Sequence, residues 1–294
     1  MEKRRSRNGI RPYLWLAPST ILMAVFMLVP IGYVFYMSMS KVTKAGLVKE
    51  FNGFDNFSAV LNDPSFAFVL KNTLVWTVAV VGISTLLGFL LALLLNKEFK
   101  GRKIARAIMV FPWATTLVIQ ACVWKFMINT DFGALNTLLK ALGLISHNVN
   151  WTPTPGAFFA WEIACGIFVT VPFVCFTTLS GLQSIDRTVY EAATVDGSSA
   201  WQQLTRITIP LVRPSLTVAT VLNIIYVFNS FPIVWTMTRG DPAGRTDTLV
   251  TYLYKLAFYN GRQGEAAAVS VIGFLILLIC AGVYMFRTLK KGNE

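Results

Sequence analysis

The chain has 294 residues, of which 55% are hydrophobic and only 14% are charged. A soluble globular chain carries roughly 25% charged residues, so this composition excludes an ordinary soluble protein and predicts an integral membrane protein. The net charge of +12 is then explained by membrane topology rather than by nucleic-acid binding.

Six stretches are nearly free of charge and approach the roughly 20 apolar residues that a helix needs to cross a bilayer. Because the backbone inside lipid must satisfy its own hydrogen bonds, these stretches are predicted to be helices. The expected fold is an all-α integral membrane protein with six transmembrane helices, forming one transmembrane domain over residues 1–294. The expected spans are 12–38, 70–95, 105–127, 158–182, 211–237 and 264–286.

The Lys and Arg residues predict the orientation, because cytoplasmic loops carry an excess of them. With a cytoplasmic N-terminus, sixteen of the 26 Lys and Arg residues lie inside. Both termini and the loop between spans four and five are then cytoplasmic. The basic, apolar start is too long for a signal peptide and lacks a clean cleavage site, so we expect a retained first helix. The chain is expected to be a multi-pass protein of a bacterial-type cytoplasmic (inner) membrane.

The sequence has few of the motifs that nucleotide-binding, catalytic or metal sites require. The sequence has no phosphate-binding G-x-x-x-x-G-K-[ST] loop, and its single histidine, His147, lies in an outside loop. The four cysteines lie in predicted spans without metal-ligand spacing, so neither a catalytic nor a metal site is expected. Lys125 and Glu162, near the outer ends of spans three and four, are interpreted as solvated interface charges.

The inside loop between spans four and five, residues 186–210, has a helical pattern of its own. Asp186 is a candidate N-cap, Gly197 suits the left-handed end of a first short helix, and Ser199 with Gln202 forms the spacing of a capping box. A second short helix follows, and Pro210 opens the fifth span. This predicts a helix–Gly–helix hairpin that either docks into a partner or lies on the lipid surface.

Polar uncharged residues in the spans are candidates for a solute pathway. Asn223 and Tyr226 share one face of span five, and an amide beside an aromatic ring suits a neutral polyol. Hydrogen bonding between helices is the alternative explanation. The candidate pathway residues are Asn223, Tyr226, Asn229, Gln120 and Thr170.

The hairpin also carries a sequence resemblance. Glu191-Ala192-Ala193, then Gly197 and the stretch 207–210, resembles the EAA motif of membrane subunits of binding-protein-dependent ABC importers. Ile209 stands where that family prefers leucine. In that family the hairpin docks into a cleft on a cytoplasmic ATPase. The resemblance therefore implies that coupling to the ATPase is carried by Glu191, Ala192, Ala193, Asp196, Gly197, Ile207 and Pro210.

The resemblance covers most of the chain and is to the carbohydrate (maltose/glycerol-phosphate-type) permeases in particular. It rests on the outside-loop pattern 51–57, on Trp124 followed by Gly133 and Asn136, and on the stretch 238–242, where Asp241 replaces a usual glycine. It implies a second permease subunit, two ATPase subunits that hold ATP and Mg, and an extracytoplasmic solute-binding protein. No cofactor on this chain and no nucleic acid are implied.

The expected function is import of a sugar, oligosaccharide or polyol by an ATP-driven ABC importer whose ATPase is a separate chain. One alternative is the same architecture importing a non-sugar such as glycerol-phosphate, for which Arg or Lys would be expected in the pathway. The other is a secondary transporter, for which a titratable group near the membrane midplane would be expected. The charge-free runs contain neither.

Overall fold

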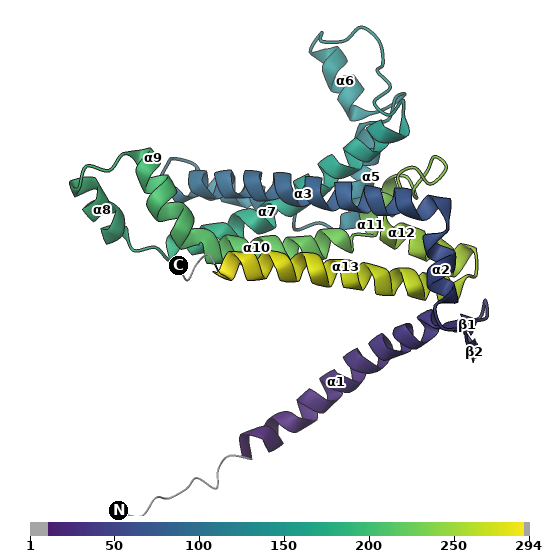
Figure 1. The fold of residues 1–294 in the computed structure, drawn as a ribbon. Helices are drawn as coiled ribbons and strands as arrows, with labels where there is room; N and C mark the ends of the chain where they lie inside the picture. The colour runs from purple at the N-terminus through teal and green to yellow at the C-terminus, as the bar shows by residue number, and fades with distance from the viewer. Residues whose placement is uncertain (1–10, 291–294) are drawn as a thin grey trace, which may run out of the picture. The chain divides into compact units, whose positions relative to one another are not determined.

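The computed structural model describes residues 11–290, and its side chains from 15 to 286. This part of the chain is mostly helical, as expected, with one two-stranded antiparallel sheet formed by β1 (Ser40–Val42) and β2 (Val48–Phe51). Figure 1 shows the course of the chain. The predicted cytoplasmic ends of the chain lie outside the described residues.

The helices in chain order are α1 (Arg11–Ser38), α2 (Asp55–Leu61), α3 (Pro64–Asn96), α4 (Arg102–Val110), α5 (Leu117–Met127), α6 (Ala134–Ala141), α7 (Pro155–Gln183), α8 (Arg187–Val195), α9 (Ala200–Gln203), the π-helical turn η1 (Leu204–Thr208), α10 (Ile209–Phe228), α11 (Pro232–Met237), α12 (Leu249–Tyr254), the π-helical turn η2 (Lys255–Tyr259) and α13 (Gln263–Lys290).

The chain divides into two compact units. The N-terminal unit comprises the chain up to Asn62 together with Leu253–Ile272, and the core unit comprises Asp63–Tyr252 and the chain from Gly273 onward. The N-terminal unit therefore holds α1, the β-hairpin, α2, η2 and the first residues of α13. The prediction of a single transmembrane domain stays a prediction.

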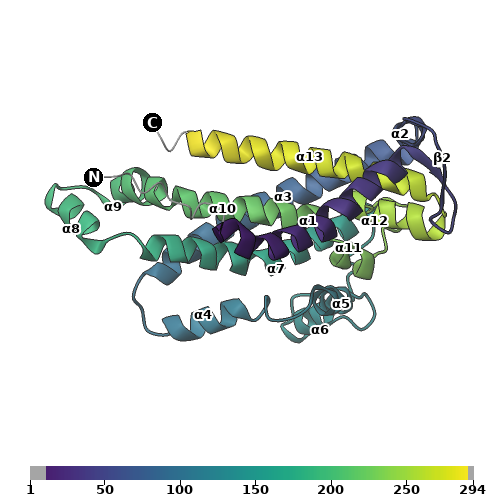
Figure 2. The same cartoon turned by 90° about the horizontal axis from the view of Figure 1, so that it is seen from below.

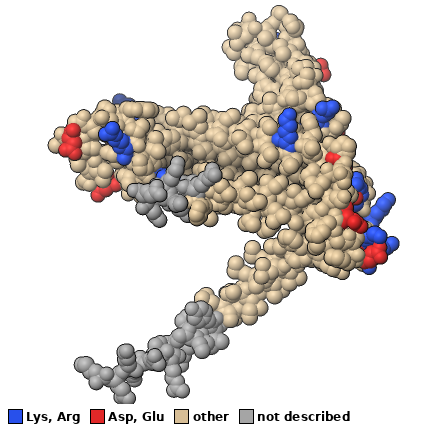
Figure 3. Space-filling model, viewed as in Figure 1, with Lys and Arg blue, Asp and Glu red and all other residues tan. Residues whose placement is uncertain are grey.

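The core unit is built on α3, α7 and α10, which pack against one another and run side by side in Figures 1 and 2. Glycines allow close approach: an added Cβ at Gly88 of α3 would lie 2.7 Å from the Cβ of Val174 in α7. Trp76 of α3 is fully buried, and its indole N–H donates to the Val227 carbonyl of α10 at 2.9 Å. In Figure 3 charged side chains gather at the end of the core unit where α8 and α9 lie.

Five helices of the described chain are long and apolar enough to cross a membrane: Trp15–Ser38, Pro64–Asn96, Pro155–Gln183, Ala200–Met237 and Gln263–Phe286. Five of the six expected spans therefore coincide with such a helix, and the count of six is not confirmed. The exception is the expected span 105–127.

The expected continuous helix over 105–127 is interrupted, which corrects that prediction. α4 ends at Val110 and α5 begins at Leu117. Pro112 is the physical reason, since proline has no N–H to donate to the helix. The Gln120 side chain reaches back from α5 and donates to the Pro112 carbonyl at 3.1 Å, so the break is satisfied internally.

A second interruption lies within the candidate span that matches the expected span 211–237. α10 ends at Phe228 and α11 begins at Pro232, so the helix breaks within the span. Side chains again bond to carbonyls beside the break: Trp76 donates to Val227, and the Asn229 amide donates to the Ile225 carbonyl at 2.9 Å.

The close contact at Gly88 yields a stability prediction. Gly88→Ala is expected to lower the apparent unfolding temperature by a few degrees, because overpacking against Val174 costs about 1–3 kcal/mol. Gly82→Ala on the same helix is the matched control, since its Cβ would meet nothing within 4 Å. Thermal unfolding of the two variants in detergent measures the difference, and equal midpoints would contradict the packing of α3 on α7.

Candidate functional site

The first helix of the hairpin, α8, is fixed at its start by Asp186. Its carboxylate accepts a hydrogen bond from the Thr188 backbone N–H at 2.9 Å. This hydrogen bond lowers the pKa of Asp186, because it stabilises the charged form. The predicted N-cap is therefore confirmed.

The turn between α8 and α9 is set by Gly197 and Ser199. Gly197 has φ +78°, a left-handed conformation that glycine adopts without strain, and its N–H donates to the Thr194 carbonyl. Ser199 then caps α9, and both hydrogen bonds of the capping box with Gln202 are present. The sequence thus predicted the turn at Gly197 and the capping box correctly.

Side-chain hydrogen bonds tie α8 to the helix that follows the turn. The Gln203 amide donates to the Thr194 hydroxyl at 3.0 Å and to the Ser198 hydroxyl at 3.2 Å. The Tyr190 and Thr208 hydroxyls lie 3.0 Å apart. Because these contacts join both arms of the hairpin, the two arms are expected to move together.

The second arm differs from the prediction of a separate short helix. α9 has only four residues and continues through η1 into α10, with the Ile209 N–H donating to the Leu204 carbonyl. We call the continuous helical segment from Ala200 to Phe228 the coupling rod. Ile207 and Pro210, two of the predicted coupling residues, lie within this rod rather than in a loop.

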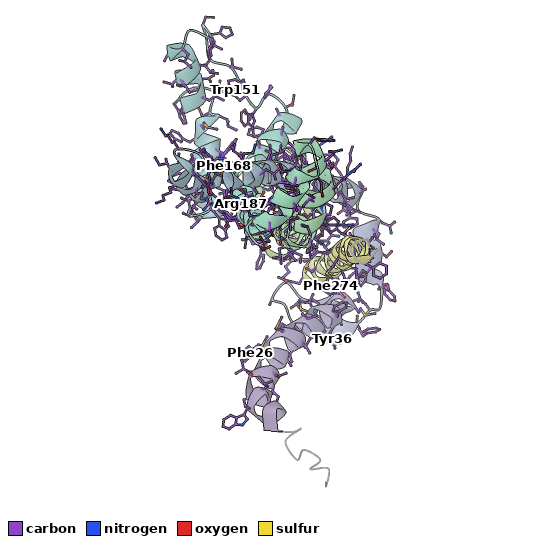
Figure 4. The ribbon with its side chains drawn as sticks, turned by 90° about the vertical axis from the view of Figure 1, so that its left-hand side faces the viewer. Phe26, Tyr36, Trp151, Phe168, Arg187 and Phe274 are labelled. Atoms are coloured by element: carbon purple, nitrogen blue, oxygen red, sulfur yellow. The ribbon has the colours of Figure 1, made fainter. Side chains whose placement is uncertain are left out.

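The outer face of the hairpin is open. None of the residues of α8 is buried, and Glu191 makes one ion pair, with Arg187 one turn earlier. Val195 and Trp201 are large apolar side chains with exposed fractions of 87% and 71%. Figure 4 looks along the core unit from the hairpin end, where Arg187 is labelled. Of the predicted coupling residues, those exposed on this hairpin are Glu191, Ala192, Asp196, Gly197 and Pro210, while Ala193 and Ile207 are partly buried.

The predicted pathway residues of span five do not share one environment. Asn223 is buried, and its amide donates to the Ser84 hydroxyl of α3 at 2.8 Å, while its side-chain oxygen is left without a partner. Tyr226 is 47% exposed, and Asn229 bonds its own helix. Asn223 therefore forms a hydrogen bond between two helices, whereas the aromatic ring of Tyr226 is exposed.

Two predicted pathway residues of other spans are buried. Gln120 bonds the Pro112 carbonyl and the Thr115 hydroxyl at the break between α4 and α5. Thr170 donates to the Gly166 carbonyl of its own helix at 2.8 Å. Nearby, Trp113 packs on Phe173 and is 59% exposed. Among the described side chains, no hydrogen bond joins Gln120 or Thr170 to Tyr226.

Glu162 corrects the interpretation of a solvated charge. Its side chain is fully buried, one carboxylate oxygen accepts from the Thr238 hydroxyl at 2.6 Å, and the other has no partner. Lys125 instead donates to the Thr236 carbonyl. Glu162 is buried because α11 packs on α7. Its position one helical turn before the closely packed Gly166 is a sequence signal that could have shown this.

No group of three His, Cys, Asp or Glu side chains within residues 15–286 is arranged to hold a metal ion. The feature that the structure defines is instead an exposed hairpin that is continuous with the helix α10 of the core unit.

Residues 84–289 match the family model described as "Binding-protein-dependent transport system inner membrane component".

Three known proteins are similar to this chain over nearly its whole length. A probable ABC transporter permease protein of Brucella suis is 45% identical over 95% of this chain and 96% of its own. The trehalose/maltose transport system permease protein MalF of Thermococcus litoralis is 34% identical, covering 96% and 95%. A chain in the crystal structure of a bacterial alginate ABC transporter in complex with an alginate pentasaccharide-bound periplasmic protein has a TM-score of 0.80 and 25% identity, covering 96% of both chains.

The fold and the hairpin thus define a multi-pass helical transport subunit rather than an enzyme. The chain belongs to the family of binding-protein-dependent transport system inner membrane components. The predicted membership among ABC importer permeases of the carbohydrate type is confirmed.

Proposed function

We propose that this chain moves a sugar, oligosaccharide or polyol across the bacterial-type inner membrane and is driven by a separate ATPase that docks on the hairpin of residues 186–210. The observation that carries this proposal is the coupling rod, because an exposed docking surface is continuous with a helix of the membrane bundle. The named relatives that handle trehalose and maltose, or alginate, support a carbohydrate as the solute.

The proposed assembly has two permease subunits and two ATPase subunits. The ATPases bind ATP and Mg, and this chain binds no cofactor. The hairpin and both termini face the cytoplasm, and a solute-binding protein delivers the solute on the other side. In this arrangement α4 and α5 together form the third of six crossings. Glu191, Ala192, Ala193, Asp196 and Gly197 contact the ATPase, while Ile207 and Pro210 pass its motion into α10.

The proposed solute pathway is lined by exposed aromatic rings and runs beside the helix breaks of the core unit. Irregular backbone at membrane depth is tolerated where it is buried in protein or lines a watery path. The break between α4 and α5 presents Trp113 beside Gln120, and α10 presents Tyr226. Aromatic rings cover the apolar face of a sugar, and amides bond its hydroxyls. Asn223, Asn229 and Thr170 stay candidates as neighbours of this path.

Glycerol-phosphate is the alternative solute. Residues 163–185 and 214–238 contain no Lys or Arg, so this chain offers a phosphate no charged partner in the middle of α7 or α10. A secondary transporter would need a buried titratable group, and Glu162 is such a group. The membership in a binding-protein-dependent family speaks against that mechanism.

Gly197→Asp tests the docking role. The variant is expected to insert and assemble, because an added Cβ at Gly197 meets nothing within 4 Å in the chain itself. Uptake per ATP hydrolysed should fall about 5- to 150-fold, the range of typical coupling free energies, because a carboxylate and a strained turn disturb the docking surface. Proteoliposomes that contain the ATPases and the binding protein measure both rates.

Gly197→Asn is the matched control, because asparagine tolerates the left-handed conformation and adds no charge. It should retain more coupling than Gly197→Asp. Normal coupled uptake by Gly197→Asp would show that the hairpin does not dock.

Tyr226→Ala tests the pathway. The KM of uptake is expected to rise about fivefold through loss of an aromatic contact worth about 1 kcal/mol, with assembly unchanged. Leu222→Ala, one turn earlier on α10 and equally exposed at 48%, is the control and should leave the KM unchanged. If both variants transport like the wild type, Tyr226 does not line the path.

A further inference from the structure

A polar groove of about 370 Å³ lies within the N-terminal unit, and none of its lining residues belongs to the hairpin of residues 186–210 or to the proposed pathway. Its walls come from the β-hairpin, from Asn56 of α2, and from the segment Gly261–Glu265 at the start of α13. It therefore joins segments that are about 200 residues apart in the sequence.

The walls of this groove are held in place by specific contacts. The Asn56 amide donates to the carbonyls of Ser38 and Ser40, at 3.0 and 2.9 Å. Gly264 packs directly on Asn56, and a Cβ there would lie 2.8 Å from its amide nitrogen. The groove is thus a fixed feature of the fold of this unit.

The charge of the groove is positive. Three basic side chains line it, and Glu265 is the single acidic side chain among its lining residues. Arg262 pairs with Glu265, and Lys41 pairs with Glu50 at 2.6 Å. Lys49 lines the groove and makes no ion pair among the described side chains, so it is available for an anionic ligand.

The depth of the groove in the membrane follows from the chain on either side. The apolar helix α1 ends at Ser38, and the apolar helix α13 begins at Gln263, both within a few residues of the groove. Exposed aromatic side chains lie beside it in sequence: Tyr36 on α1, labelled in Figure 4, and Tyr259 at the end of η2. Aromatic residues of this kind mark the level of the lipid headgroups.

We propose that this groove binds the phosphate of an anionic phospholipid headgroup, with Lys49 as the principal contact and Lys41 and Arg262 completing the basic wall. Clustered Lys and Arg side chains at a membrane surface attract anionic lipid headgroups electrostatically. A lipid fits better than an acidic protein surface, because the groove adjoins two membrane-spanning helices whose apolar sides accommodate acyl chains.

The test is lipid retention by the assembled importer, purified from a detergent mixture with equal amounts of phosphatidylglycerol and phosphatidylcholine and analysed by native mass spectrometry. The wild type should retain phosphatidylglycerol in preference to phosphatidylcholine. Lys49→Gln should reduce the retained phosphatidylglycerol about fivefold, the effect of one basic residue at a membrane surface. Lys140→Gln, which removes an exposed lysine of α6 outside the groove, is the matched control and should change nothing.

Three results would overturn the proposal. Equal retention of both lipids by the wild type, or equal effects of Lys49→Gln and Lys140→Gln, would show that the groove selects no anionic lipid. Displacement of the retained lipid by 10 mM inorganic phosphate, roughly ten-thousandfold above a dissociation constant of about 1 μM, would assign the groove to free phosphate. Weaker binding of the solute-binding protein to Lys49→Gln, with unchanged lipid retention, would assign it to an acidic protein.

Discussion

The continuous helical course of the coupling rod, from Ala200 to Phe228, is the constraint on which the rest of the structure depends. A flexible linker between the hairpin and α10 would absorb any displacement of the hairpin. The helical turns of α9 and η1 instead extend α10 directly to the hairpin, and the Tyr190–Thr208 and Gln203–Thr194 contacts tie α8 to the same segment. Motion imposed on α8 is therefore expected to reach the membrane bundle.

The coupling rod ends at a break in the helical backbone of the core unit. α10 stops at Phe228, and α4 stops at Val110 before α5 begins at Leu117. In a bilayer backbone carbonyls need partners, and Gln120, Trp76 and Asn229 add side-chain hydrogen bonds to carbonyls beside these breaks. Such breaks are positions where helices change direction without melting, so they suit segments that open and close a path. The close packing of α3 on α7 provides the rigid body against which they move.

Local features of the fold were predictable from sequence because their causes are local. The caps at Asp186 and Ser199 and the turn at Gly197 depend on residues within four positions of each other, and all three are present. The helix breaks depend on how side chains such as Gln120 satisfy freed carbonyls, which no short pattern shows. The burial of Glu162 and the Asn223–Ser84 contact arise between helices distant in sequence, so the sequence left them open or pointed elsewhere.

The stiffness of the rod can be tested without changing its length. Replacing Thr205 and Arg206 together by glycine adds a flexible joint, since each glycine weakens a helix by about 1 kcal/mol relative to alanine. Replacing both by alanine removes the same side chains but keeps the helix. Solute transported per ATP hydrolysed is the decisive quantity in reconstituted importer. The account predicts a severalfold lower ratio for the double glycine variant than for the double alanine variant, and equal ratios would contradict it.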